Sequence, residues 1–211
     1  MRQPQQHSRA ASGLGTGLWG WTERLRAHQR GRRAERAAAH LLYGDLVSHA
    51  RSERFYRELG VPDTPEGRFE IIGLHAALLM RRLKGEGKPG RALGQALFDL
   101  MFADMDASLR ELGVGDLSVG KQVKRLAGQF YARLAALERV LGAAEPGLLA
   151  PILETNVWQG GAPPSAAQVE ALADYLVAAE RDLAGQAGSA LLRGAARFPR
   201  LARGAPPARS D

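Results

Sequence analysis

Residues 61–84 are the most informative stretch of the sequence and read VPDTPEGRFEIIGLHAALLMRRLK. The stretch opens with a helix-start signal, because Asp63 or Thr64 can accept hydrogen bonds from the first free N–H groups and Pro65 fits the first helical position. Glu66 follows in the first turn, where a negative charge complements the helix dipole. We therefore predict a helix that begins at Pro65.

This predicted helix is apolar on almost every side. One face carries Phe69, Ile72, Ala76, Leu79 and Leu83, and the face is widened by Ile71, Leu74, Leu78 and Met80. A helix that is apolar all round is buried among other elements, here in the middle of a bundle. His75 lies within it, and we expect this residue to be a hydrogen-bonded core histidine rather than a metal ligand.

The sequence on both sides of this helix has a helical pattern as well. Apolar residues recur at spacings of three and four in residues 34–50, 93–112, 119–141 and 165–183, and shorter helices fit residues 52–59 and 148–157. Expected caps are Ser52, Asp116 or Ser118, and Ser165, and KGEGKPGR (84–91) is expected to be a turn. No segment alternates Val, Ile or Thr as a strand would. We predict an all-α fold, a single bundle-like domain of about six to eight helices over residues 34–184.

Positive charge is concentrated at the two ends of the chain. Residues 1–36 carry eight Arg against two Glu, a balance of +6, and residues 185–211 carry five Arg against one Asp, a balance of +4. We expect residues 1–33 and 185–211 to be flexible basic arms that bind a polyanion such as an anionic membrane or ribosomal RNA. The middle of the chain is net negative, so no sequence-specific DNA binding is expected.

The N-terminal arm also carries apolar side chains beside its arginines. These are Leu14, Leu18, Trp19 and Trp21. Tryptophan and leucine next to arginine suit the interface of an anionic membrane, and we take these four residues as candidates for membrane contact. The alternative is that they pack against the folded domain.

Several kinds of chemistry are excluded or unsupported. The chain has no cysteine, which excludes disulfides and thiolate metal sites. GTGLWG (15–20) fits a dinucleotide motif without a preceding strand, and GDLSVGKQ (115–122) lacks the hydroxyl that a phosphate-binding loop needs at its last position. The five histidines show no ligand spacing. We therefore expect no enzyme, no metal and no cofactor.

The expected location is a cytoplasm-like compartment. No apolar run reaches the length of roughly 18 residues that spans a bilayer, and the Arg-rich start does not look like a secretory signal. The absence of cysteine also fits a reducing environment.

Three long stretches closely resemble the ubiquinol–cytochrome c chaperone family. They read LLYGDLVSHAR (41–51), FYRELGVPDTPEGRFEIIGLH (55–75) and DLMFADMDASLRELGVGDLSVGKQVKRLAGQFYARL (99–134). The resemblance covers roughly residues 38–184. Two short segments depart from the family pattern, since FYAR (130–133) stands where FYGR is expected and LETN (153–156) matches only loosely.

The resemblance implies an assembly factor for complex III, ubiquinol–cytochrome c reductase, rather than an enzyme. Mitochondrial members bind newly made cytochrome b, hold it before haem-loaded assembly, and work near the ribosomal tunnel exit with a small partner. The resemblance therefore implies an analogous bacterial role in this chain, as a cytoplasmic chaperone of apocytochrome b or of a complex III assembly intermediate, peripheral at the inner membrane.

Charged and aromatic residues of the two signature segments are the candidates for client or partner binding. They are Arg68, Phe69, Glu70 and His75 in the first segment, and Asp104, Asp106, Arg110, Glu111, Asp116, Lys121, Lys124 and Arg125 in the second. Asp106 and Arg110 are spaced for an ion pair on one helix. Met101, Phe102 and Met105 either line an adaptable apolar groove or belong to the ordinary core.

Two alternatives from other functional classes stay open at this point. A ribosome- or nucleic-acid-binding helical module would owe its affinity to the basic arms and would be strongly salt-dependent. A lipid- or quinone-binding α-bundle would need a contiguous apolar cavity in its core.

Overall fold

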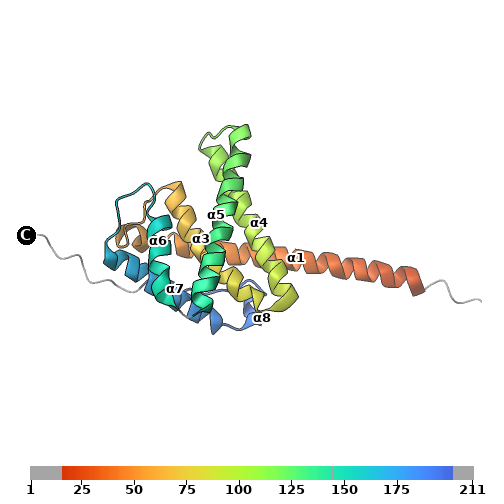
Figure 1. The fold of residues 1–211 in the computed structure, drawn as a ribbon. Helices are drawn as coiled ribbons and strands as arrows, with labels where there is room; N and C mark the ends of the chain where they lie inside the picture. The colour runs from red at the N-terminus through yellow and green to blue at the C-terminus, as the bar shows by residue number, and fades with distance from the viewer. Residues whose placement is uncertain (1–15, 144, 202–211) are drawn as a thin grey trace, which may run out of the picture. The chain divides into compact units, whose positions relative to one another are not determined.

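The computed structural model describes residues 16–143 and 145–201, with the backbone alone described for residues 16–28, 30, 117 and 146. These residues form eight α-helices and one 3-10 helix, and none of them lies in a strand (Figure 1). The elements are α1 (Thr16–Ala50), α2 (Glu53–Arg57), α3 (Pro65–Lys84), α4 (Gly87–Glu111), α5 (Asp116–Gly142), η1 (Pro146–Leu148), α6 (Leu149–Val157), α7 (Ala166–Ala184) and α8 (Gly188–Leu191). The predicted all-α fold is confirmed.

The chain divides into two units after Ala34. Among the described residues, the first unit contributes the backbone of α1 from Thr16 to Ala34. Helical backbone thus begins within the arm that we expected to be flexible, because good helix formers such as Arg, Leu and Ala outnumber the glycines after residue 20. The division into arms and domain stays a prediction.

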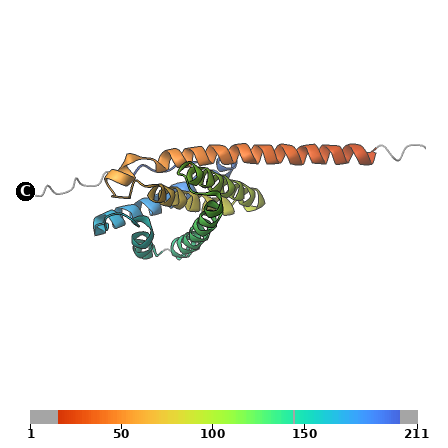
Figure 2. The ribbon, with the colours of Figure 1, turned by 90° about the horizontal axis from the view of Figure 1, so that it is seen from above.

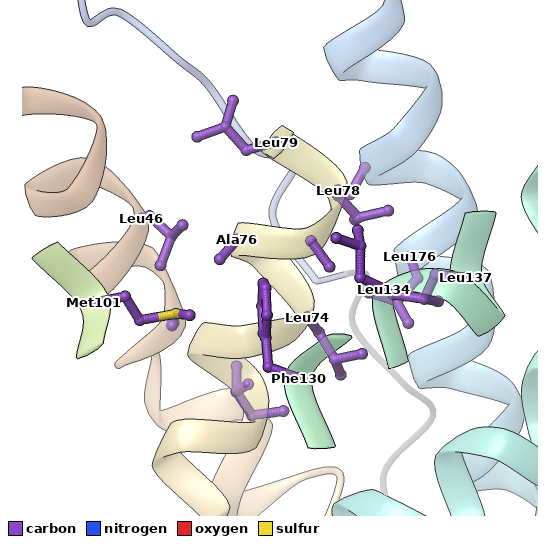
Figure 3. Close-up of a cluster of buried hydrophobic side chains, with 14 of the residues drawn as sticks. Leu46, Leu74, Ala76, Leu78, Leu79, Met101, Phe130, Leu134, Leu137 and Leu176 are labelled. Atoms are coloured by element: carbon purple, nitrogen blue, oxygen red, sulfur yellow. The ribbon is translucent and has the colours of Figure 1, made fainter. Parts of the chain in front are cut away.

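Helix α3 is the central helix of the second unit. It contacts α4, α5, α6 and α7, and every residue from Phe69 to Leu79 except Ile72 is buried. Figure 3 shows its side chains Leu74, Ala76, Leu78 and Leu79 among Met101 of α4, Phe130, Leu134 and Leu137 of α5, and Leu176 of α7. Helix α3 is therefore apolar on almost every side because four other helices pack around it.

Two predicted helix starts have side-chain caps in the structure. Thr64, rather than Asp63, caps α3, since its Oγ1 accepts a hydrogen bond from the Gly67 N–H at 3.1 Å. Ser165 caps α7 through a reciprocal pair of hydrogen bonds with Gln168. Capping leaves the side chain of Asp63 free for the ion pair described below.

The α4–α5 hairpin differs in two details from the sequence-based expectation (Figures 1 and 2). Helix α4 begins at Gly87, inside the expected turn, because Pro89 lies in the first turn, where the missing N–H costs nothing. The prediction that Asp116 or Ser118 caps α5 is wrong. Gly115 occupies the N-cap position and makes no side-chain bond, while the Asp116 carboxylate pairs with Arg110.

Residues 185–201 pack against the helices of the second unit. Leu191, Ala196 and Leu201 are buried, and Gln186 holds the backbone of Arg197 by two hydrogen bonds of 2.7 and 2.9 Å. These residues differ from the flexible tail that we expected from residue 185, because the three apolar side chains outweigh the high content of glycine and arginine. Residues 202–211 lie outside the described residues.

Candidate functional site

The end of α1, the short helix α2 and the start of α3 form a charged groove on the surface. Its walls are lined by Arg51, Glu53, Tyr56, Arg57, Asp63 and Arg68, and its volume is about 470 Å³. Arg68 Nε donates to Asp63 Oδ1 at 2.6 Å, and this hydrogen bond lowers the pKa of the Asp63 carboxyl. The Arg68 side chain is therefore fixed at the mouth of the groove and stays accessible.

Asp104 of α4 is linked to the same charged region through Tyr43 of α1 and Arg51, the residue that follows α1. Tyr43 Oη donates to Asp104 Oδ2 at 2.8 Å, and burial together with this hydrogen bond raises the pKa of Tyr43. Burial raises the pKa of both Tyr43 and Tyr56, and the positive charge of Arg51 opposes this rise at both, so Arg51 lies near the two side chains. We call Tyr43, Arg51, Tyr56, Asp63, Arg68 and Asp104 the polar surface.

The polar surface unites residues that the sequence placed in two separate sets. Arg68 comes from the first signature segment and Asp104 from the second, and neither Tyr43 nor Arg51 was a candidate. No local sequence pattern could identify Tyr43 as a partner of Asp104, because the two residues are 61 positions apart and meet only in the folded chain.

The turn between α4 and α5 carries a second charged cluster. Arg110 Nε donates to Asp106 Oδ2 at 2.6 Å, as the spacing predicts, and Arg110 also pairs with Asp116 across the turn. Glu111 is exposed, and the Leu112 side chain next to it has 61% of its surface exposed. The hairpin end thus carries an exposed apolar side chain next to charged residues in the sequence.

Lys121, Lys124 and Arg125 form a basic patch on α5. All three side chains are exposed, and the structure pairs none of them with a carboxylate among the described residues. They are cations without a partner within the described part of the chain, which makes the patch available to an acidic ligand.

The remaining candidates of the first segment are buried and serve the core. Phe69 packs edge-on against Phe102 with ring centres 5.9 Å apart. Met101 and Phe102 are likewise buried, so they belong to the core rather than to an open groove. Direct contact of these side chains with a partner would require the helices to separate.

Glu70 forms a buried ion pair with Arg133 of α5. Arg133 Nη2 lies 2.6 Å from Glu70 Oε1, and both side chains are about nine-tenths buried. Arg133 Nε also points to Asn156 of α6 at 3.5 Å, while Glu70 Oε2 and Arg133 Nη1 have no protein partner. Burial raises the pKa of Glu70 to about 7 against the opposing effect of the Arg133 charge, and lowers the pKa of Arg133.

His75 belongs to a chain of three polar side chains from α1, α3 and α7. Its Nδ1–H donates to the Ile71 carbonyl at 2.7 Å, so its Nε2 accepts from Tyr175 Oη at 2.6 Å. The Tyr175 oxygen in turn accepts from His49 Nε2 at 2.9 Å. Burial lowers the pKa of His75 to about 4, and it lowers the pKa of His49 as well.

The chain His49–Tyr175–His75 supports the expected role of His75 as a hydrogen-bonded core histidine. His49 and Tyr175 were not predicted as its partners, although Tyr175 is the one aromatic hydroxyl on the apolar helix 165–183. Within the described ranges, no three His, Asp or Glu side chains gather as metal ligands would.

A further groove lies between the end of α1 and residues 196–201. Its volume is about 1030 Å³, and Asp45, Arg54, Glu58, Arg197 and Arg200 are among its lining residues. These charged walls do not resemble the contiguous apolar cavity that a quinone-binding bundle requires.

Comparison with known proteins identifies the family. Residues 57–198 match the family model described as ubiquinol-cytochrome C chaperone. The chain belongs to this family. The matched range contains both signature segments from Arg57 onward, and it extends into the packed residues after α8. The resemblance that the sequence motifs indicated is confirmed.

Two animal proteins are similar to part of the chain. The chain is 27% identical to ubiquinol-cytochrome c reductase complex assembly factor 1 of Mus musculus over 139 residues, which cover 66% of this chain and 46% of that protein. The protein of the same name from Drosophila melanogaster is 29% identical over 108 residues, covering 49% of this chain and 42% of that protein. The chain thus spans less than half the length of these two relatives.

A solved structure is also similar to most of the chain. The crystal structure of the Cbp3 homolog from Brucella abortus is 34% identical and superimposes with a TM-score of 0.72, covering 84% of this chain and 97% of that chain. No helix among the described residues has both the length and the apolar character needed to cross a membrane.

Proposed function

We propose that this chain is an assembly chaperone for ubiquinol–cytochrome c reductase and that it binds newly made cytochrome b before the complex is completed. The match of residues 57–198 to the chaperone family carries the proposal. The names of the mouse and fruit-fly relatives as assembly factors of this complex support it.

The basic patch and the α4–α5 turn are the proposed client-binding face. A new membrane protein presents apolar helices joined by charged loops, so its chaperone needs exposed apolar and charged groups side by side. The turn offers Leu112 beside Glu111, and α5 offers Lys121, Lys124 and Arg125 without ion-pair partners in the described chain.

Reversal of the basic patch tests this role. In a strain that lacks its own copy of the gene, we expect the triple variant Lys121→Glu, Lys124→Glu and Arg125→Glu to behave like the deletion. The b-type signal in redox difference spectra of the membranes and the ubiquinol–cytochrome c reductase activity should both fall to the level of the deletion strain, because an acidic client segment would meet like charge.

A matched control separates this effect from a change in net charge. Lys88→Glu, Arg91→Glu and Arg193→Glu reverse three exposed cations elsewhere on the same unit, and this variant should restore both signals. Immunoblots must show equal amounts of each variant. Normal complex III in the patch variant would show that the patch is not the client site, and normal complex III in the deletion strain would contradict the assembly role itself.

We also propose that the N-terminal arm holds the protein at the cytoplasmic face of the inner membrane. The support is the balance of +6 in residues 1–36 and the presence of Trp19 and Trp21. Leu14 lies outside the described residues, and the side chains of Leu18, Trp19 and Trp21 are not described, so their membrane contact stays a prediction.

Vesicle sedimentation checks the arm. The full chain should sediment with vesicles of phosphatidylglycerol and phosphatidylcholine and not with phosphatidylcholine alone, and about 1 M salt should release it. A chain lacking residues 1–33 should stay in the supernatant. Equal sedimentation of both chains would contradict the proposal, and binding to purified ribosomes instead of vesicles would assign the arm to RNA.

A further inference from the structure

A groove between α6 and α7 has an apolar floor and an acidic rim. Its volume is about 500 Å³, and it shares no residue with the polar surface or the basic patch. The floor is built from small or branched residues that are buried or half-buried, namely Ala150, Pro164, Val169, Ala173 and Val177. The rim consists of three acidic residues, Glu154, Glu170 and Asp174.

The groove exists because the sequence of α7 places small residues on one stripe. Val169, Ala173 and Val177 follow one another at intervals of four, so they lie in a row along one side of the helix. Ala150 of α6 faces the same hollow. Residues with a single methyl group at Ala150 and Ala173 leave room between the two helices that larger side chains would fill.

The acidic rim has no positive partner among the described residues. Glu154, Glu170 and Asp174 are exposed, and the structure gives their side chains neither an ion pair nor a hydrogen bond. Glu170 and Asp174 are also one helical turn apart, where two like charges destabilise a helix. The repulsion between these carboxylates destabilises the isolated chain. A bound cationic partner would replace this repulsion with attraction.

The charge of the rim selects the kind of occupant. Three carboxylates repel the phosphates of a nucleic acid or of an anionic membrane. They also disfavour symmetric pairing with the same face of a second copy, because that pairing would bring the three carboxylates of each copy together. What remains complementary is a protein segment that carries both apolar and cationic side chains.

We propose that the α6–α7 groove binds an amphipathic helix of a partner protein, with its apolar side chains in the groove and its Lys or Arg side chains on Glu154, Glu170 and Asp174. A helix fits because the apolar row at intervals of four and the neighbouring helix α6 form a channel into which the ridge of a third helix packs. Helix α6 has nine residues, so the contact extends over roughly two to three turns of the guest helix. This binding site is independent of the proposed client face.

A designed peptide pair tests the groove with the full-length chain. The probe is a fluorescent 14-residue amphipathic helix of leucine and lysine, compared with the same pattern in leucine and glutamate. We expect the lysine peptide to bind and the glutamate peptide not to bind. In the variant Glu154→Lys, Glu170→Lys and Asp174→Lys, the Kd of the lysine peptide should rise at least about tenfold, because three exposed ion pairs each contribute a few-fold.

Two further variants make the result specific for the groove. Asp45→Lys, Asp99→Lys and Asp182→Lys change the net charge equally at exposed positions outside the groove, and the Kd of the lysine peptide should change by less than about threefold. Ala173→Leu fills the floor without any change of charge and should weaken binding about tenfold. Circular dichroism must show the same helix content in each variant.

The contradicting outcomes are equally defined. The proposal is wrong if the rim variant and its charge control lose affinity equally, or if Ala173→Leu binds the lysine peptide as the wild type does. A wild type that is dimeric by light scattering and becomes monomeric in the rim variant would assign the groove to a second copy instead.

Discussion

Arg133→Met is expected to lower the free energy of unfolding by about 3–5 kcal/mol, since it leaves the Glu70 carboxylate buried without its counter-ion. The loss should be largest above pH 7 and smaller near pH 5. In the folded state burial raises the pKa of Glu70 to about 7, above its ordinary value of 4.5. The Arg133 charge holds this pKa down in the wild type, so in the variant the carboxyl keeps its proton to a higher pH still, and the variant loses stability relative to the wild type mainly as the pH rises above 7. Urea unfolding followed by circular dichroism measures both effects.

Two variants show whether this loss comes from the uncompensated charge. Glu70→Leu together with Arg133→Met removes both charges and should restore the free energy of unfolding to the wild-type value or above it. Arg139→Met makes the same substitution at an exposed position of α5 and should change it by no more than about 0.5 kcal/mol. A loss below about 1 kcal/mol for Arg133→Met at pH 8 would refute the expected role of the pair.

His75 is expected to make the domain less stable in acid. Its pKa falls from 6.5 in the unfolded chain to about 4 in the folded protein because the imidazole is buried. The unfolded state therefore binds the proton first, and the free energy of unfolding decreases as the pH falls from 6.5 to 4. The decrease assigned to His75 amounts to roughly 3 kcal/mol and is complete below pH 4.

The variant His75→Gln isolates this contribution. Glu70 acts in the opposite direction between pH 7 and 4.5, so the wild-type curve alone mixes the two groups. The difference in unfolding free energy between wild type and His75→Gln should be constant above pH 7 and should shrink by roughly 3 kcal/mol toward pH 4. His40→Gln controls for the loss of one imidazole from an exposed position. A difference that does not vary with pH would mean that His75 is not the buried neutral base described here.

Local patterns were sufficient to predict most of the fold. The helix start at Pro65, the all-round apolar character of α3 and the capping serine at Ser165 depend on neighbours within a few residues, and such signals are readable in one sequence. We predicted the start of α4 too late in the sequence, because one proline and three glycines within residues 84–91 are typical of a turn. A proline is also common in the first turn of a helix, so its presence alone does not distinguish a turn from a helix start.

The hydrogen-bond partners of the buried polar side chains could not be predicted from such local patterns. His49 and His75 have no meaningful spacing along the chain, yet the hydroxyl of Tyr175 joins them. Glu70 was recognised as a candidate, but its partner Arg133 lies on another helix. Partners of this kind are set by which helix faces meet, and one amphipathic sequence does not specify its neighbour.

The contacts made by residues 175–201 also set the order of events when the protein is made. Arg54 of α2 donates a hydrogen bond to the carbonyl of Leu201, and His49 of α1 forms a hydrogen bond with Tyr175 of α7. Each bond joins an early residue to one that is synthesised much later. A ribosome therefore has to synthesise nearly the whole second unit before its first helices find their final neighbours. Contacts this distant along the chain slow folding and leave apolar surface open in the meantime. Phe55, fully buried in the finished domain, is part of that surface during synthesis.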